Sequence, residues 1–177
     1  QFSEPGAGGT TDPDKTLREL FERYVERYSE KRDHVARDEK EVWKLFRHPL
    51  EQKRVTKYLQ PHTIVSSDYE YEFEHAWKNR QWRVLEPVSF DLENAHSIKD
   101  KAARWLGRAM ALQNSKEEFK LYLLLGKPLR EELLQAYTKA ENILHKMPGK
   151  KEFVREHEAE DFANTIQHEI EEHEGEA

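Results

Sequence analysis

The sequence predicts an α/β (α+β) domain built on a single mixed β-sheet that contains a meander and is flanked by helices. Two alternating runs, residues 69–77 and 81–92, are separated by a short polar turn, which is typical of a β-hairpin. A continuous apolar run at residues 120–125 stops at a glycine and a proline, as a buried central strand does. Helical patterns precede and follow that run, and helices that alternate with strands after a meander favour one mixed sheet.

Four segments are expected along the chain. Residues 1–13 are rich in Gly, Thr and Pro and are interpreted as a flexible linker or tail. Residues 14–60 are predicted to be a helical N-terminal segment, residues 61–172 the α/β core, and residues 173–177 an acidic disordered tail. In the core we expect strands at 62–66, 69–77, 81–92, 120–125 and 152–156, and helices at 97–113, 129–147 and 159–172.

Local signals set several of these boundaries. Asp14 is a plausible N-cap for an amphipathic helix in the N-terminal segment. A short apolar patch then ends at His48-Pro49, and a polar helix is expected over residues 50–60. In the core, Ser97 and Asp100 have the spacing of a capping box, which predicts that a helix begins at Ser97.

The composition of the 177 residues limits the classes of function. The chain is long enough for one domain with a sizeable core, and it has no apolar run that could cross a membrane. Because it contains no cysteine, disulfides, thiolate metal sites and a cysteine nucleophile are excluded. The absence of cysteine also fits a reducing compartment, so a cytoplasmic location is expected. The sequence begins at Gln1, and we interpret it as a fragment whose oligomeric state the sequence does not fix.

Charge is distributed unevenly along the chain. The net charge is −6, but no Lys or Arg follows Arg155. Residues 1–155 hold all 29 basic residues and 26 of the 35 acidic ones, a net charge of +3. The body of the protein therefore permits a polyanionic partner, and the acidic C-terminal end disfavours one nearby.

The segment 31–57 is a candidate nucleic-acid-binding surface. It holds nine basic and five acidic residues, with Trp43, Phe46 and Tyr58 interleaved. Basic side chains next to aromatic ones suit contact with nucleic acid, although a solvated helical face gives the same pattern. The basic residues predicted to make the contact are Lys40, Lys44, Arg47, Lys53, Arg54 and Lys57.

Glu86 is the best single candidate for a functional residue. In the second run of the hairpin it shares a face with Trp82, Val84, Val88 and Phe90. A carboxylate among apolar neighbours is costly unless it is paired, protonated or bound to a metal ion. Glu86 therefore either lies at a site or accepts hydrogen bonds that hold the sheet.

An acidic ladder runs along the first strand of the hairpin. Glu70, Glu72 and Glu74 alternate with aromatic residues. We interpret the ladder as a solvated face that pairs with Arg80 and Arg83 of the turn and the partner strand, rather than as a metal site.

A family resemblance follows from the order of these elements. A helix, a β-meander, a helix and a buried strand, over about residues 50–126, resemble the core of the restriction-endonuclease-like fold of the PD-(D/E)XK nucleases. Members carry an Asp near the start of one meander strand and Glu-x-Lys on the next. Asp68 and Glu86-Pro87-Val88 stand at these places here. The segment NRQWRVLEPVSFDL, followed by SIKDKAARWLG, is also similar to the ends of uncharacterised bacterial proteins that are degenerate relatives of this fold.

The resemblance implies a site with one part missing. In active members the acidic residues hold Mg²⁺ and the lysine helps to activate water and stabilise the transition state. Asp68 and Glu86 would be the metal ligands here, but Val88 stands in the lysine's place, and Lys101 of the following helix is the candidate replacement. A nucleic-acid-associated domain with a degenerate site is therefore expected. An active Mg²⁺-dependent nuclease that uses Asp68, Glu86 and Lys101 is the first alternative. A non-catalytic module that binds a protein partner is the second.

Overall fold

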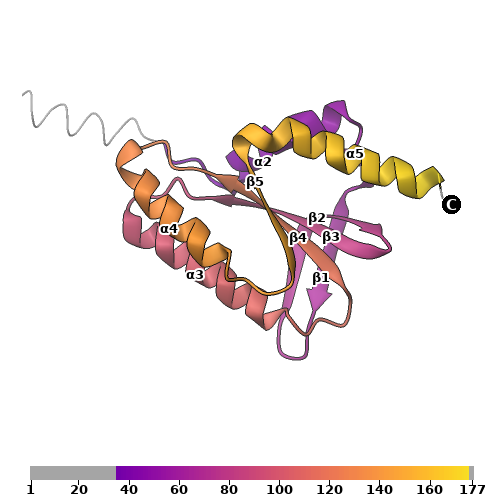
Figure 1. Ribbon diagram of the computed structural model, residues 1–177, viewed down its shortest axis with the longest axis horizontal. Coiled ribbons are helices and arrows are strands. Elements are labelled where there is room, and N and C mark those ends of the chain that lie inside the picture. Colours follow the sequence, from indigo (N-terminus) through magenta and orange to yellow (C-terminus); the bar gives the residue numbers. More distant parts are fainter. Residues whose placement is uncertain (1–34, 176–177) are drawn as a thin grey trace, which may run out of the picture. The chain divides into compact units, whose positions relative to one another are not determined.

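A five-stranded mixed sheet with helices on both faces forms the centre of the protein (Figure 1). The structure, a computed structural model, describes residues 35–175, so the predicted linker, the Asp14 helix and the last two residues of the acidic tail lie outside the described part. The strands are β1 (Gln60–Val65), β2 (Glu70–Asn79), β3 (Gln81–Ser89), β4 (Phe119–Gly126) and β5 (Lys150–Arg155). The helices are α2 (Glu39–Gln52), α3 (Ala95–Ala111), α4 (Leu134–Leu144) and α5 (Ala159–Gly175).

The spatial order of the strands follows the sequence, β1-β2-β3-β4-β5. The first three strands are an antiparallel meander, and β3, β4 and β5 are parallel to one another. Helices α3 and α4 make the two crossovers between the parallel strands, and they pack side by side on one face of the sheet, while α2 and α5 cover the other face (Figure 1). The predicted mixed sheet with a meander and flanking helices is thus confirmed.

The apolar core has two parts, one on each face of the sheet. Strand β4 is buried on both faces, because Leu121, Leu123 and Leu125 contact the α3/α4 side while Tyr122 and Leu124 contact the α2/α5 side. Such a strand has no polar face, which explains why its sequence is a continuous apolar run. None of the helices in residues 35–175 has the length and apolar character needed to span a bilayer.

Several predicted helix boundaries are wrong. Helix α5 extends to Gly175, so residues 173–175 of the predicted disordered tail are helical. Helix α2 does not stop at His48-Pro49 but continues through Pro49 to Gln52, and residues 56–58 form a 3-10 helix in place of the predicted polar helix. Helix α3 begins at Ala95, because the side chain of Asn94 rather than Ser97 is the N-cap and accepts a hydrogen bond from the Ser97 N–H. The helix therefore begins about one turn earlier than the capping box at Ser97 predicts.

A β-bulge in β2 reverses the faces of its last residues. His62 of β1 pairs with Phe73, whereas Gln60 pairs with Ala76, so β2 holds one extra residue between these pairs. Phe73 contacts the core on the α3/α4 side, but Trp77 contacts the core on the α2/α5 side. The predicted common face of Tyr69 to Trp77 is therefore broken at the bulge.

The bulge coincides with a separation of two neighbouring strands. Pairing of β2 with β3 covers only His75–Asn79 against Gln81–Leu85. Beyond that point β2 continues to pair with β1 as far as Glu70, and β3 continues to pair with β4 as far as Ser89. The first half of β2 and the second half of β3 therefore diverge, and Glu86 is the first residue of β3 in the diverging part.

Gly126 allows α2 to approach the end of β4. A Cβ at this position would overlap the side chain of Val42, which is fully buried. We expect Gly126→Ala to destabilise the protein by about 1–3 kcal/mol through overpacking. Gly107→Ala is the matched control, since a Cβ on this residue of α3 meets no atom within 4 Å and should stabilise the helix by roughly 0.5–1 kcal/mol. Urea unfolding followed by circular dichroism measures both, and equal stabilities would contradict the close approach of α2.

Candidate functional site

The diverging strands open a cleft between the α2 and α3 sides of the sheet. Two adjoining cavities of about 250 Å³ and 330 Å³ lie there. Both are lined by Glu39, Tyr71, Glu86 and Pro87. We call these two cavities the splay cleft. Glu86 is reached from both of them because it lies where β2 and β3 separate.

Glu86 is a half-buried carboxylate with a polar partner. The hydroxyl of Tyr71 on β2 donates a hydrogen bond to its Oε1 at 3.0 Å across the gap between the strands. Burial raises the pKa of Glu86 to about 7, against the lowering effects of the Tyr71 hydrogen bond and the charge of Arg108, while Glu74 and Glu39 raise it further. Near neutral pH this side chain can therefore accept or release a proton, as a general acid or base must.

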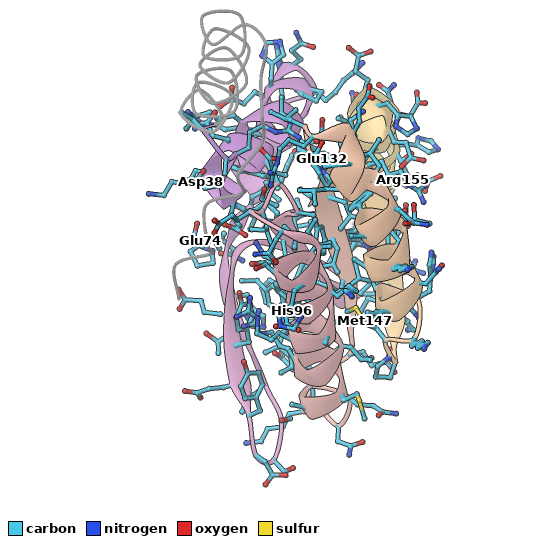
Figure 2. All side chains as sticks on the ribbon, turned by 90° about the vertical axis from the view of Figure 1, so that its left-hand side faces the viewer. Asp38, Glu74, His96, Glu132, Met147 and Arg155 are labelled. Atoms are coloured by element: carbon cyan, nitrogen blue, oxygen red, sulfur yellow. The ribbon has the colours of Figure 1, made fainter. Side chains whose placement is uncertain are left out.

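The side of the cleft next to α2 combines carboxylates with aromatic rings. Glu39 and Lys40 come from the first turn of α2, whose N-cap is Asp38, and Glu74 comes from β2. Figure 2 shows Glu74 next to the beginning of α2. The rings of Trp43 and His75 stack on each other with centroids 3.8 Å apart.

The side of the cleft next to α3 is basic. Lys101, Arg104 and Arg108 line it together with Trp105. The ammonium of Lys101 donates a hydrogen bond to the Ser89 carbonyl oxygen at 2.7 Å and forms an ion pair with Glu39. Lys101 thus connects α3 with the end of β3 and the start of α2.

Arg108 is restrained by contacts with two aromatic rings. Its guanidinium lies 4.3 Å from the ring centroids of both Tyr71 and Trp105, and its Nε donates to the Tyr69 hydroxyl at 3.2 Å. Cation–π contacts with these two rings restrict the side chain, so its charge stays near Glu86. Tyr71 therefore positions two functional groups, the carboxylate of Glu86 and the guanidinium of Arg108.

Of the three predicted catalytic residues, the structure brings two together. Glu86 and Lys101 line the same cavity, and the ammonium of Lys101 reaches the Ser89 carbonyl oxygen at the end of β3. Asp68 does not line either part of the splay cleft. It is exposed in the turn before β2, where its carboxylate accepts a hydrogen bond from Ser67 at 2.9 Å. The predicted pairing of Asp68 and Glu86 as metal ligands is therefore not seen, because the divergence of the strands begins farther along β2.

The predicted basic surface contributes fewer residues to the splay cleft than its composition indicates. Of its six residues, only Lys40 lines the splay cleft. Lys44 pairs with Glu41 at 2.5 Å and Arg47 with Glu51 at 2.6 Å on the exposed face of α2. Lys53 and Arg54 are exposed after the end of the helix, and Lys57 lies 4.6 Å from the ring centroid of Tyr58. The solvated helical face, the alternative interpretation, describes Lys44 and Arg47 better.

The acidic ladder is a solvated face, as predicted, but the predicted pairing with Arg83 is wrong. Glu70, Glu72 and Glu74 are all exposed, and the last two also border the splay cleft. Arg83 is not their partner, because it forms an ion pair with Glu169 of α5 at 3.1 Å and donates to the Tyr122 hydroxyl at 3.0 Å.

The residues of the cleft that were not predicted from the sequence include Glu39, Tyr71, Arg104 and Arg108. The sequence contains a signal for Arg104 and Arg108, since they follow Lys101 at helical spacing and therefore share its face of the helix. It contains no signal for Glu39 and Tyr71, because the positions of these two residues depend on the packing of α2 and on the divergence of β2 from β3.

The donor atoms of the cleft suit a hard cation in an open site. Among residues 35–175 there is no group of three or more His, Cys, Asp or Glu side chains arranged to hold a metal ion. Mg²⁺, however, is commonly bound through one or two carboxylates, with water and substrate phosphate completing its shell. Glu39 and Glu86 supply such oxygens.

Comparison of the chain with protein-family models, curated proteins and solved structures finds no significant match.

Proposed function

We propose that the protein is a Mg²⁺-dependent nuclease whose active site is the splay cleft. The observation that carries this proposal is that the carboxylate of Glu86 lines one cavity together with Lys101, Arg104 and Arg108. Hydrolysis of a phosphodiester needs groups of both kinds, since a proton must be moved and the negative charge of the phosphate must be balanced. The cleft offers both kinds side by side.

Glu39 and Glu86 are the residues that would hold the metal ion. The negative charge of Glu39 raises the pKa of Glu86, so the two carboxylates repel each other, and a divalent cation would relieve this repulsion. When bound, Mg²⁺ lowers the pKa of a water ligand and balances charge on the phosphate. Glu74, which also raises the pKa of Glu86, adds a third negative charge near this position.

The basic side chains would hold the substrate. Lys101, fixed by the Ser89 carbonyl oxygen and by Glu39, is placed to contact a phosphate next to Glu86. Arg108 is fixed by Tyr71 and Trp105, and a side chain that is already ordered loses little entropy when it binds an anion. Arg108 can therefore stabilise charge that develops on the phosphate without prior rearrangement.

The element order supports the same proposal. Helix α2, the meander β1-β2-β3, helix α3 and the buried strand β4 stand in the order on which the resemblance to the PD-(D/E)XK nucleases is based. Glu86 lies on the third meander strand, and Lys101 lies on the next helix rather than at the place of Val88. We propose that Lys101 takes over the role of the missing lysine.

Nucleic-acid binding without cleavage is the second candidate. Val88 is buried in the core and cannot act on a phosphate. Lys101 already has two partners, Glu39 and Ser89, and it would have to give up part of these contacts to bind substrate. Both observations favour a site that binds but does not cut.

Cleavage assays with Lys101→Met separate the two candidates. The wild-type protein is incubated with labelled DNA or RNA in Mg²⁺, in Mn²⁺ and in EDTA. We expect cleavage that needs the metal ion and that falls at least about 100-fold in Lys101→Met, because a charge that stabilises the transition state is lost. Lys139→Met, at an exposed lysine of α4, is the control and should cleave like wild type. The proposed activity would be refuted if the wild-type protein does not cleave the probes. It would also be refuted if Lys101→Met cleaves them as fast as the wild type.

A further inference from the structure

The basic side of the splay cleft has the geometry of a track for a phosphate backbone. Lys101, Arg104 and Arg108 lie at positions i, i+3 and i+7 of α3 and therefore share one face of the helix. At the rise of an α-helix this row is about 10 Å long, enough to contact successive phosphates of one strand. Arg104, the middle residue of the row, is exposed, whereas Lys101 and Arg108 at its two ends are half-buried. All three line the cavity that contains Glu86, so the row runs along one side of that cavity.

The opposite side of the cleft offers an aromatic platform. Trp43 is half-buried against the α2/α5 core and stacks on His75, and both line the cavity that contains Glu86. Burial lowers the pKa of His75, so the ring stays neutral at physiological pH and is suited to stacking. Cationic side chains along a groove, together with aromatic rings for the bases, are the features by which proteins bind single-stranded nucleic acid.

The half-buried position of Glu86 argues against an intact duplex. The carboxylate lies between the two sides of the cleft, in cavities of about 250 Å³ and 330 Å³, the larger of which is within the size range of sites for small ligands. A single nucleotide unit of a flexible strand can enter such a space. In a duplex both strands are held in a stiff helix, and enzymes that act at enclosed sites need single strands or extruded nucleotides.

We infer that the substrate is single-stranded nucleic acid, whose backbone follows Lys101, Arg104 and Arg108 while a base stacks against Trp43. This inference rests on the proposed function, since it specifies the substrate class of the same cleft. It places the main phosphate contacts on α3, whereas the composition of the sequence points to the segment around α2.

Binding measured without cleavage tests the inference separately from the activity. Fluorescence anisotropy is recorded with a labelled single-stranded 20-nucleotide DNA, an RNA of the same sequence and the matching DNA duplex. Ca²⁺ replaces Mg²⁺, and a denaturing gel of each sample checks that the probes stay intact. We expect tighter binding of the single strands than of the duplex, with affinity that falls as salt rises.

Two variants and a control locate the contacts. Arg104→Gln should reduce the slope of log affinity against log salt by about one, whereas Lys139→Gln on α4 should leave it unchanged. Trp43→Leu should weaken single-strand binding roughly tenfold or more, with circular dichroism confirming that the variant is folded. Equal or tighter binding of the duplex, no binding of any probe, or an Arg104→Gln slope equal to that of Lys139→Gln would overturn the inference. The cleavage assay would still decide the proposed activity on its own.

Discussion

Glu86→Gln is expected to abolish Mg²⁺-dependent cleavage while making the protein more stable at alkaline pH. The amide keeps the shape of the side chain and an oxygen that can accept the Tyr71 hydrogen bond, but it cannot carry the charge that holds a metal ion or moves a proton. Loss of such a group lowers rates by about 100-fold or more. Cleavage of a labelled single strand in Mg²⁺, measured beside the wild type, gives the activity change.

The gain in stability follows from the raised pKa of Glu86. The folded protein holds a proton on this residue up to about pH 7, whereas the unfolded chain releases it near its ordinary pKa of 4.5. The free energy of unfolding of the wild type therefore falls as pH rises from about 4.5 to 7. Above pH 7 the charged, desolvated carboxylate costs at most about 3 kcal/mol, and solvent in the cleft reduces this figure. Glu86→Gln removes that cost at pH 8 and changes little at pH 5.

The matched control for Glu86→Gln is Glu70→Gln, an exposed glutamate of β2 that lines neither cavity. It should keep full activity, and its unfolding free energy should follow that of the wild type at every pH. Urea unfolding at pH 5 and pH 8 measures all three proteins. A Glu86→Gln protein that is less stable than wild type at pH 8 would show that the carboxylate forms a net stabilising contact with Arg108, contrary to the expectation.

The strands were predictable because their signals are local. Alternation of polar and apolar residues identifies β2 and β3 as a hairpin, and the apolar run of β4 identifies a strand with both faces buried. The bulge was not predictable, since an extra residue between Phe73 and Ala76 leaves the alternation of residue types intact. The sequence thus indicates a hairpin but not the point at which its strands diverge, and that point determines where the cleft opens.

The site was predictable only where a single residue contradicts its surroundings. Glu86 is a charge in an apolar row, which marks it in the sequence without any knowledge of distant residues. Its neighbours Glu39 and Lys101 come from helices on opposite faces of the sheet, and nothing in their local sequence shows that they meet. Asp68 was chosen from its place before the first hairpin strand, which matches the family pattern, but the turn before β2 places it outside the cleft.

The position of Glu39 depends on a buried network at the start of α2. Asp91 is fully buried after β3, and its carboxylate accepts hydrogen bonds from the backbone N–H groups of Arg37 at 3.0 Å and Leu129 at 3.1 Å. The side chain of Arg37 lies 4.0 Å from Asp91 and pairs with Glu156 at 2.7 Å. Asp91 therefore fixes the residue that precedes the N-cap of α2 to the ends of the parallel strands.

Asp91→Ala is expected to destabilise the protein by about 2–6 kcal/mol, because its removal leaves two partly buried backbone donors without an acceptor. Glu51→Ala is the matched control, since its partner Arg47 is exposed on α2 and a surface ion pair contributes less than about 1 kcal/mol. Urea unfolding measures both losses. In the folded fraction, Asp91→Ala should also weaken Mg²⁺-dependent cleavage, because the start of α2 no longer holds Glu39 beside Glu86. Equal stability losses for the two variants would show that the buried network does not anchor α2.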